Sequence, residues 1–323
     1  MLRCRLLVDD DYPILELGVF AGMGMEYGDV PSAGNICAIA KISGQLCMIL
    51  ANDATIKGGT IYPIGLKKTL RCHEIAMQNS LPCFHYVDSG GGFLPLQADI
   101  FLEGGRAFYN EAVMNSMGIP QICIVAGSCT AGGAYIPTMA NQVVMVDKIA
   151  SIFLAGPPLV YAAIGQRISD QGLGGASVHC DVSGVADYKA VDELDAIETA
   201  KDIMSTLNMD VYVEEADHVE EPFFDAADLA VLSVHRDDDN RMDARGILSR
   251  VVDGSRFHEF KPTWGSELIT GFARVHGVLV GVVANNGAFT SDACQKGANF
   301  VTMCHQRGTP ILFLQHITGK ILK

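Results

Sequence analysis

The sequence has 323 residues, a length that predicts two domains, and its 49% hydrophobic and 19% charged residues predict large buried cores rather than a disordered chain. The formal net charge of -14 argues against nucleic acid as the main partner, because no basic stripe is present to neutralise phosphates. Charges, glycine or proline interrupt each apolar run before it reaches membrane-spanning length, so a membrane protein is also excluded.

The sequence alternates apolar runs with segments of helical period. It predicts strands over 45–51, 82–87, 121–126, 143–147 and 151–154, and helices over 67–79, 107–117 and 190–207. Because these strands lack polar alternation and are separated by helices, we expect sheets that are covered on at least one face. The fold class is therefore α/β.

The composition changes after this region. Acidic residues are concentrated over 209–228 and 235–246, which predicts a linker with a solvated acidic face. Strands follow over 278–284 and 311–314, with a helix over 292–306 between them. We expect a first domain over 1–212 and a second over 213–323.

The second region repeats the first. Asn52 in the segment GQLCMILANDA pairs with Asn285 in GVLVGVVANNGA at an offset of 233 residues, and Pro82 pairs with Pro310 at an offset of 228. Two matched strands with an intervening helix at a nearly constant offset indicate an internal duplication. At this offset the counterpart of Gly132 would fall near position 361, beyond Lys323, so the second copy is expected to be truncated.

The ten cysteines predict neither disulfides nor a metal site, because no C-x-x-C pair occurs and Cys47, Cys83 and Cys123 lie inside apolar runs. A reducing compartment is the expectation. The first residues, MLRCRLLVDDD, include acidic side chains that targeting peptides avoid, so we expect no targeting peptide within this sequence.

A glycine-rich turn, GSCTAGGAYIP over 127–137, follows the apolar run 121–126. Its small residues Ala131, Gly132, Gly133 and Ala134 leave backbone N–H groups uncovered, and such a turn can form an oxyanion hole. The alternative is a strand-to-helix turn where helix and sheet simply pack closely. Because the turn contains no ionisable acid or base, any chemistry there would depend on main-chain dipoles.

Two other chemistries suit the same stretch less well. Ser128 and Cys129 could suggest an acyl nucleophile, but G-x-S-x-G is not satisfied. A hydratase would need a carboxylate near the turn, and none lies between 127 and 141. Four cationic residues could gather to hold an anionic small ligand: Lys57, Lys67, Lys68 and Arg71.

Nine segments in order carry a resemblance that covers essentially the whole chain: VPSAGNI, ANDATIKGGTIYP, DSGGGFLPLQAD, FYNEAVMNSMGIPQI, GSCTAGGAYIP, FLAGPPLV, LGGASVHC, VVDGSRFHEF and FLQHITG. Together they resemble the carboxyltransferase (beta, non-biotin) subunits of biotin-dependent acyl-CoA carboxylases, most closely those that act on 3-methylcrotonyl-CoA. The resemblance implies a crotonase-like fold of stacked β-β-α units, duplicated, with an active site between subunits of a homo-oligomer.

The resemblance also implies site residues. The turn Ala131, Gly132 and Gly133 would offer N–H groups to the thioester oxygen of acyl-CoA, and a matching turn beyond Lys323 would hold carboxybiotin. Further substrate-binding residues are expected at Gly90, Gly91, Gly92, Ala134, Tyr135, Gly156, Pro157 and Lys57. Simple turn packing is the alternative for the glycines and Pro157.

The implied reaction transfers CO2 from carboxybiotin to the γ-carbon of 3-methylcrotonyl-CoA, in leucine degradation. Biotin would be carried by a partner alpha subunit that uses ATP and bicarbonate, and the expected location is the mitochondrial matrix, with the bacterial cytoplasm as alternative. The competing interpretations are another crotonase-like enzyme, such as a propionyl- or geranyl-CoA carboxylase or a decarboxylase, and an inactive fragment or assembly partner.

The end of the chain departs from the family. The family continues from ITG into most of a second domain, whereas this sequence ends in ITGKILK over 317–323. Gly-Lys can be encoded by GGT AAG, which contains a consensus intron donor. We therefore expect read-through of an intron in a eukaryotic gene.

Overall fold

The computed structural model describes residues 2–207, 219–232 and 243–315. The chain forms two compact units, Met1–Ser205 and Thr206–Lys323. This division lies a few residues before the expected boundary at 212. Much of the acidic segment and the whole ending ITGKILK lie outside the described residues. Among the described helices, none combines the length and the apolar character needed to cross a bilayer.

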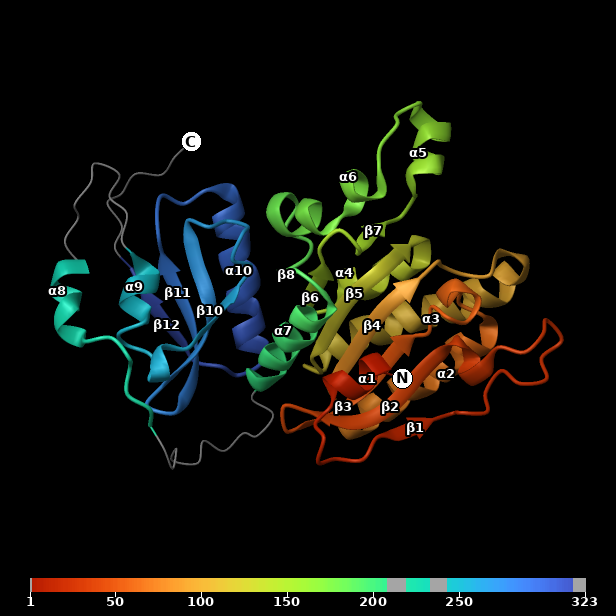
Figure 1. Cartoon of the computed structure of the whole chain (residues 1–323), viewed down its shortest axis with the longest axis horizontal. Coiled ribbons are helices and arrows are strands. Elements are labelled where there is room, and N and C mark those ends of the chain that lie inside the picture. Colours follow the sequence, from red (N-terminus) through yellow and green to blue (C-terminus); the bar gives the residue numbers. More distant parts are fainter. Residues whose placement is uncertain (1, 208–218, 233–242, 316–323) are drawn as a thin grey trace. The chain divides into compact units, whose positions relative to one another are not determined.

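The first unit is built on an eight-stranded sheet (Figure 1). Its strands are β1 (Leu15–Leu17), β2 (Asn35–Ile42), β3 (Gln45–Asn52), β4 (Cys83–Ser89), β5 (Gln121–Thr130), β6 (Gln142–Val146), β7 (Ser151–Phe153) and β8 (Tyr188–Ala190). The order is β1-β2-β3-β4-β5-β6-β8, with β7 paired to β5. β3, β4, β5 and β6 are parallel to one another, so their carboxyl ends meet at one edge.

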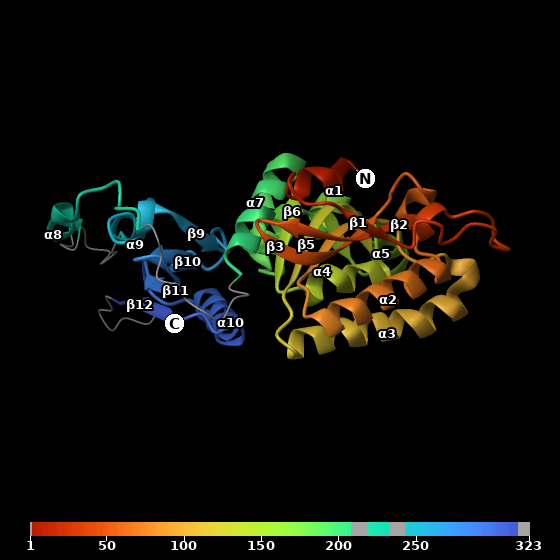
Figure 2. The same cartoon turned by 90° about the horizontal axis from the view of Figure 1, so that it is seen from below.

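Helices cover both faces of this sheet. α2 (Pro63–Asn79) and α3 (Gln97–Ser116) lie side by side on one face, while α1 (Leu2–Leu7) and α7 (Glu193–Ser205) lie on the other (Figure 2). The shorter helices are α4 (Tyr135–Met139), α5 (Pro157–Ile164) and α6 (Asp170–Gly174). The core under α2 and α3 includes fully buried Met48, Cys83 and Met114.

Several element boundaries differ from those predicted. α3 begins ten residues before the predicted start at 107, because Gly104 and Gly105 conceal its helical period. The predicted helix over 190–207 is α7, which is shorter at both ends because β8 extends to Ala190. β5 continues to Thr130, so the glycine-rich turn begins at Ala131 rather than at Gly127. β2 was not predicted from the sequence.

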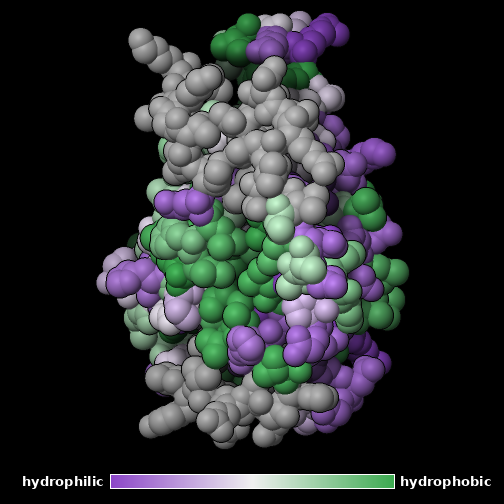
Figure 3. Space-filling view, turned by 90° about the vertical axis from the view of Figure 1, so that its left-hand side faces the viewer, coloured by the Kyte–Doolittle hydropathy of each residue, from purple (hydrophilic) through white to green (hydrophobic). Residues whose placement is uncertain are grey.

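The second unit has a four-stranded sheet in the order β12-β11-β10-β9. Its strands are β9 (Phe257–Phe260), β10 (Leu268–Val275), β11 (Val278–Asn285) and β12 (Ile311–Leu314), and its helices are α8 (Leu229–Leu232), α9 (Ala244–Leu248) and α10 (Ser291–Gln306). Apolar residues gather on the face of the molecule shown in Figure 3. β12 forms an edge of the sheet, and its Phe313 is 52% exposed.

The two units repeat one motif, which confirms the duplication. β2 and β3 form a hairpin with Asn35 opposite Asn52, and β10 and β11 form a hairpin with Leu268 opposite Asn285. In each unit the second strand runs parallel to the next one, and a helix connects the two. Both hairpins turn through two residues of positive φ ending in glycine, Ser43-Gly44 and His276-Gly277, as tight hairpins of right-handed twist require.

Candidate active site

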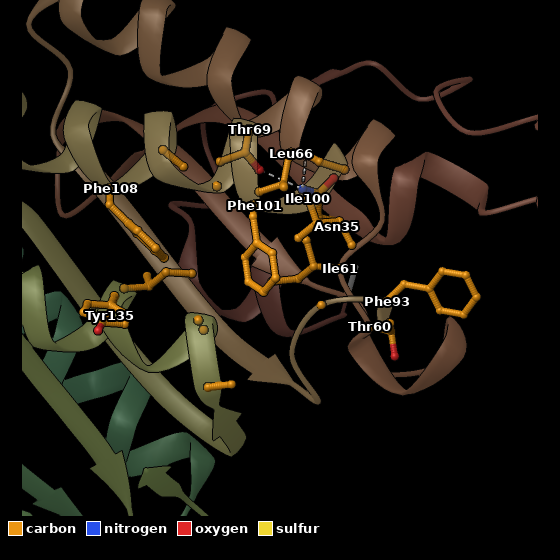
Figure 4. A pocket seen from close by; sticks show the side chains of 18 of the residues that line it. Asn35, Thr60, Ile61, Leu66, Thr69, Phe93, Ile100, Phe101, Phe108 and Tyr135 are labelled. Carbon is orange, nitrogen blue, oxygen red and sulfur yellow. Dashed lines mark hydrogen bonds between the residues drawn. The ribbon is translucent and has the colours of Figure 1, made fainter. Parts of the chain in front are cut away.

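A cavity of about 400 Å³ lies in the first unit at the carboxyl ends of β3, β4 and β5. This edge is where open α/β sheets generally bind ligands. In Figure 4, Phe108 and Tyr135 lie at the left of the view and Asn35 and Thr69 lie near its centre. Apolar side chains make up most of the wall, which suits the burial of a hydrocarbon group.

The loops after β3 and β4 are tied together at the mouth of this cavity. The Ser89 hydroxyl donates to the Gly59 carbonyl over 2.8 Å, the Ile61 N–H donates to the Gly91 carbonyl over 2.9 Å, and the Phe93 N–H donates to the Ile61 carbonyl over 2.9 Å. A Cβ on Gly59 would meet the Asp88 carbonyl oxygen at 2.2 Å, so glycine is required for this close approach. The cavity wall is therefore preformed.

The glycine-rich turn forms another wall of the cavity. Residues Ala131–Ala134 make one turn of 3-10 helix, and Ala131, Gly132 and Gly133 all line the cavity. Ala131 has φ +53, a strained conformation of the kind that persists at functional sites. A Cβ built on Gly133 meets nothing within 4 Å, and one on Gly132 meets only Phe108, at 3.9 Å. N–H groups at the start of a helix lack intrahelical acceptors, so they can bind an oxygen.

Cys129 supports this turn from below. Its thiol donates to the Gly133 carbonyl over 3.1 Å, and its side chain is fully buried. Burial raises the pKa of the thiol to about 12, so it stays protonated near neutral pH. Cys129 is therefore a support for the turn and is unsuited to act as a nucleophile.

Lys68 on α2 supports the opposite wall. Its ammonium group donates to the Ser32 carbonyl at 2.9 Å, the Ser32 hydroxyl at 2.8 Å and the Asn35 carbonyl at 2.7 Å. These bonds hold Ser32 and Ala33 at positive φ, and Ala33, Gly34 and Asn35 line the cavity. The Asn35 amide in turn donates to Thr69 Oγ1 at 3.0 Å (Figure 4).

Glu111 is a cavity residue that the sequence did not reveal. It lies on α3, twenty residues before the turn, yet it lines the same cavity as Gly132 and Gly133. The side chain is 2% exposed, and its Oε2 has no hydrogen-bond partner. Burial raises the pKa of this carboxyl from 4.5 to about 8, so it is mainly uncharged at neutral pH.

The other predicted residues are distributed over several places. Gly92 and Tyr135 line the cavity with the turn. Gly156 and Pro157, at the start of α5, line a second cavity of about 570 Å³ together with Ser128 and Lys148. Gly90, Gly91, Ala134 and Lys57 are not among the residues that line either of these two cavities.

The expected group of four cations does not assemble. Lys68 is buried and holds the Ser32 loop, and Arg71 pairs with Glu74 at 3.0 Å. Lys57 and Lys67 are exposed. Closeness in sequence does not bring these cations together, because neighbouring residues of α2 point to different sides of the helix: one face packs inward and the other faces solvent. Over the described ranges, no group of three His, Cys, Asp or Glu side chains that could hold a metal ion is found.

Comparison with known proteins places this geometry in a family. A family model described as the carboxyl transferase domain matches residues 3–322. The chain belongs to the carboxyl transferase family. The turn, the cavity and the duplicated unit are thus features of a carboxyl transferase domain.

Curated relatives of this carboxyl transferase chain are identical to it at about half of the aligned positions. It is 48% identical over 327 residues to the methylcrotonoyl-CoA carboxylase beta chain, mitochondrial, of Arabidopsis thaliana, covering 98% of this chain and 56% of that protein. It is 49% identical over 323 residues to the protein of the same name in Dictyostelium discoideum, with 98% and 55% coverage. The chain therefore spans about half the length of these relatives.

Solved structures of carboxyl transferases have the same fold as this chain. Transcarboxylase 12S, whose structure is described as a hexamer with hydrolysed methylmalonyl-CoA bound, matches with a TM-score of 0.89 at 28% identity, covering 100% of this chain and 65% of that chain. The beta subunit of geranyl-CoA carboxylase from P. aeruginosa matches with a TM-score of 0.60 at 38% identity, covering 98% and 60%. The mixed α/β, crotonase-like fold expected from the sequence is confirmed.

Proposed function

We propose that this chain is the acyl-CoA-binding part of a carboxyltransferase beta subunit that carboxylates 3-methylcrotonyl-CoA at its γ-carbon, in leucine degradation. The observation that carries the proposal is the open turn Ala131–Gly133 on the wall of an apolar cavity, in a chain 48% identical to a methylcrotonoyl-CoA carboxylase beta chain. Relatives named for propionyl-CoA and methylmalonyl-CoA chemistry are less similar, at 31% and 28%.

The turn would stabilise negative charge on the substrate. When the γ-proton of the acyl group leaves, electron density moves onto the thioester oxygen. N–H groups of the turn, fixed in advance, stabilise that oxyanion without reorganisation, and losing one such donor typically costs roughly a hundred- to a thousand-fold in rate. The backbone around the turn is tied by Cys129 and by the loops of Ser89 and Ile61, which keeps these dipoles aimed at the cavity.

The apolar wall would orient the acyl chain. Ile61, Leu66, Ile100 and Phe101 surround the cavity, and Phe108 packs against Tyr135 with ring centroids 4.9 Å apart (Figure 4). Burying a five-carbon acyl group there excludes water from the reacting carbon, which strengthens the electrostatic effect of the turn. Gly156, Pro157, Lys57 and the glycines 90–92 are proposed to contact the rest of the CoA ester.

A partner alpha subunit would use ATP and bicarbonate to carboxylate its biotin, and this carboxybiotin would supply the CO2. Donors suited to hold its ureido oxygen are the N–H groups of a second glycine turn, and the counterpart expected near position 361 lies outside this sequence. We therefore assign no described residue to biotin. Mitochondrial localisation is proposed from the names of the eukaryotic relatives.

Assembly into a homo-oligomer is part of the proposal. Large apolar side chains are exposed near the cavity, among them Leu94 (70%), Phe101 (69%) and Leu102 (78%). Side chains of this size generally become buried in subunit contacts when they cluster. The transcarboxylase 12S structure is described as a hexamer, which supports an assembly of the same kind.

Binding and turnover test the proposal separately. Isothermal titration of the chain with 3-methylcrotonyl-CoA and with free CoA should show tighter binding of the ester, because only the ester fills the apolar cavity. Carboxylation of methylcrotonyl-, geranyl- and propionyl-CoA is then measured in the particle purified with a biotin-carrying subunit. Equal affinity for CoA and its ester, or a preference for another acyl group, contradicts the proposed function.

A further inference from the structure

Glu111 occupies a defined place in the cavity. α3 runs back from the carboxyl ends of the strands toward their amino ends, so later residues of the helix lie deeper beneath the sheet edge. Phe108 packs beside Gly132, and Glu111 follows it by about one helical turn as the last residue of α3 that lines the cavity. A chain that enters at the glycine turn and extends inward is therefore directed toward Glu111.

The surroundings of Glu111 offer its carboxyl group no partner. Its backbone carbonyl accepts from the Gln121 amide over 2.8 Å, but Oε2 is buried without a hydrogen bond. Among the described residues that line the cavity, there is no lysine, arginine or histidine, and Glu111 is the one carboxylic acid. A buried polar group in such a wall seeks a polar atom from whatever enters the cavity.

The buried cysteines and histidines on the elements around Glu111 are neutral over the physiological pH range. Cys83 on β4 and Cys123 on β5 face it, and burial raises the pKa of both thiols above their usual range. His85 on β4 and His73 on α2 are buried, which lowers their pKa values to about 3 and about 4. Tyr135 faces the cavity from the turn. Burial raises the pKa of Glu111 itself to about 8. Glu111 therefore ionises near pH 8, where these thiols and histidines stay neutral.

We propose that Glu111 is a specificity-determining residue that limits the length of the apolar acyl chain accepted by the cavity. This inference rests on the proposed binding of acyl-CoA. A short acyl group stops before the carboxyl and leaves it in contact with cavity water. A longer hydrocarbon chain displaces that water and leaves both oxygens without a partner, which weakens binding.

The experiment uses the 323-residue chain and saturated esters that cannot be carboxylated at an allylic carbon. Dissociation constants of butyryl-, hexanoyl- and octanoyl-CoA are measured by isothermal titration at pH 6.5, 7.5 and 8.5. The quantity compared is the ratio of the octanoyl to the butyryl constant, because effects of pH on the shared CoA part cancel. Glu111→Leu, Glu111→Gln and wild type are compared, and Ala112→Leu, on the exposed face of α3, is the matched control.

In wild type the ratio should rise by several-fold between pH 6.5 and 8.5, as the carboxyl ionises. Glu111→Leu should lower the ratio by roughly tenfold or more, the discrimination typical of one or two methylene groups in an apolar pocket. Glu111→Gln should keep discrimination, because the amide is polar, but remove its pH dependence, because glutamine cannot ionise. Ala112→Leu should match wild type.

Two results overturn the inference alone: a ratio in Glu111→Leu equal to that of wild type, or a wild-type pH dependence that Glu111→Gln retains. If Glu111→Leu does not fold, the comparison of wild type with Glu111→Gln across pH decides by itself. If no acyl-CoA binds wild type more tightly than free CoA, the proposed function fails and this inference fails with it.

Discussion

Asp9 and Asp253 perform the same task in the two units. Asp9 accepts hydrogen bonds from the N–H groups of Ser43 at 2.9 Å and Gly44 at 2.7 Å, and Asp253 accepts them from His276 at 2.9 Å and Gly277 at 2.6 Å. Each carboxylate thus binds both residues of a hairpin turn. Because those residues have positive φ and their N–H groups point outward, the aspartate stabilises a conformation that the backbone alone disfavours.

Replacing either aspartate by alanine should destabilise its own unit. The loss of two charge-assisted hydrogen bonds is expected to lower the free energy of unfolding by about 1–3 kcal/mol in Asp9→Ala and in Asp253→Ala. Urea unfolding followed by circular dichroism measures the change. Asp10→Ala, one residue from Asp9 on an exposed position, is the control and should unfold like wild type. Equal midpoints for Asp9→Ala and Asp10→Ala contradict this prediction.

Replacing the buried lysine by methionine should change the free energy of unfolding in opposite directions in the two copies of the repeat. Lys68 and Lys296 are 228 residues apart, the offset that relates Pro82 to Pro310. Lys68 makes three hydrogen bonds, whereas Lys296 is 0% exposed and its ammonium group has no hydrogen-bond partner. Lys68→Met should lower the free energy of unfolding by about 1–3 kcal/mol, because it leaves the partly buried acceptors on Ser32 and Asn35 without this donor. Lys296→Met should raise it, because methionine fills the site without a buried charge.

The pH dependence of Lys296→Met follows from the same cause. Burial lowers the pKa of Lys296 from 10.5 to about 8. Its neutral form therefore stabilises the fold above the unfolded pKa, and this stability is lost as pH falls through about 8. The gain in free energy of unfolding from Lys296→Met should be larger at pH 7 than at pH 9. Above pH 8 this gain changes by about 1.4 kcal/mol for each pH unit. Melting curves at the two pH values measure it, and an advantage that grows with pH would refute the assignment.

A side chain at Gly133 should abolish acyl-CoA binding without unfolding the protein. The Cβ position of Gly133 is open and its φ is not positive, so Gly133→Val is accommodated by the fold while its methyl groups enter the cavity in front of the turn. We expect the affinity for 3-methylcrotonyl-CoA to fall at least tenfold and to approach that of free CoA.

The control for Gly133→Val is Ala112→Val, which adds two methyl groups on the exposed face of α3. Far-ultraviolet circular dichroism and thermal melting check that both variants are folded. Unchanged affinity for the ester in folded Gly133→Val rules out the turn as the site of the thioester.

Glu111 should make the protein less stable as pH rises. The folded-state pKa of Glu111 is raised from 4.5 to about 8, so its neutral form stabilises the fold fully below the unfolded value, and that stability is lost as pH rises through about 8. Glu111→Gln cannot ionise. Relative to wild type it should gain stability between pH 5 and pH 8, by up to about 1.4 kcal/mol per pH unit. Urea midpoints of both proteins at pH 5, 6.5 and 8 test this, and parallel pH profiles exclude it.

The sequence by itself determined the elements whose causes are local. The strand-helix-strand repeat was readable because both copies carry matching apolar runs at a nearly constant offset, and such patterns depend on neighbouring residues. The first strand of each hairpin, β2 and β10, was not predicted. The bend at Ala131–Ala134 was readable for the same reason: small residues after a buried strand leave a backbone that few other sequences allow.

Only the tertiary structure decided which side chains accompany that bend. Glu111 and Asn35 line the same cavity as the turn although both precede it in the sequence on other elements, α3 and β2, and no local pattern reports that packing. Lys68 belonged to a row of cations in the sequence, yet the helix turns it inward to hold Ser32, while Lys57 and Lys67 face solvent. Burial changes the charge preferred by a side chain, and burial is a property of the assembled layers rather than of the chain.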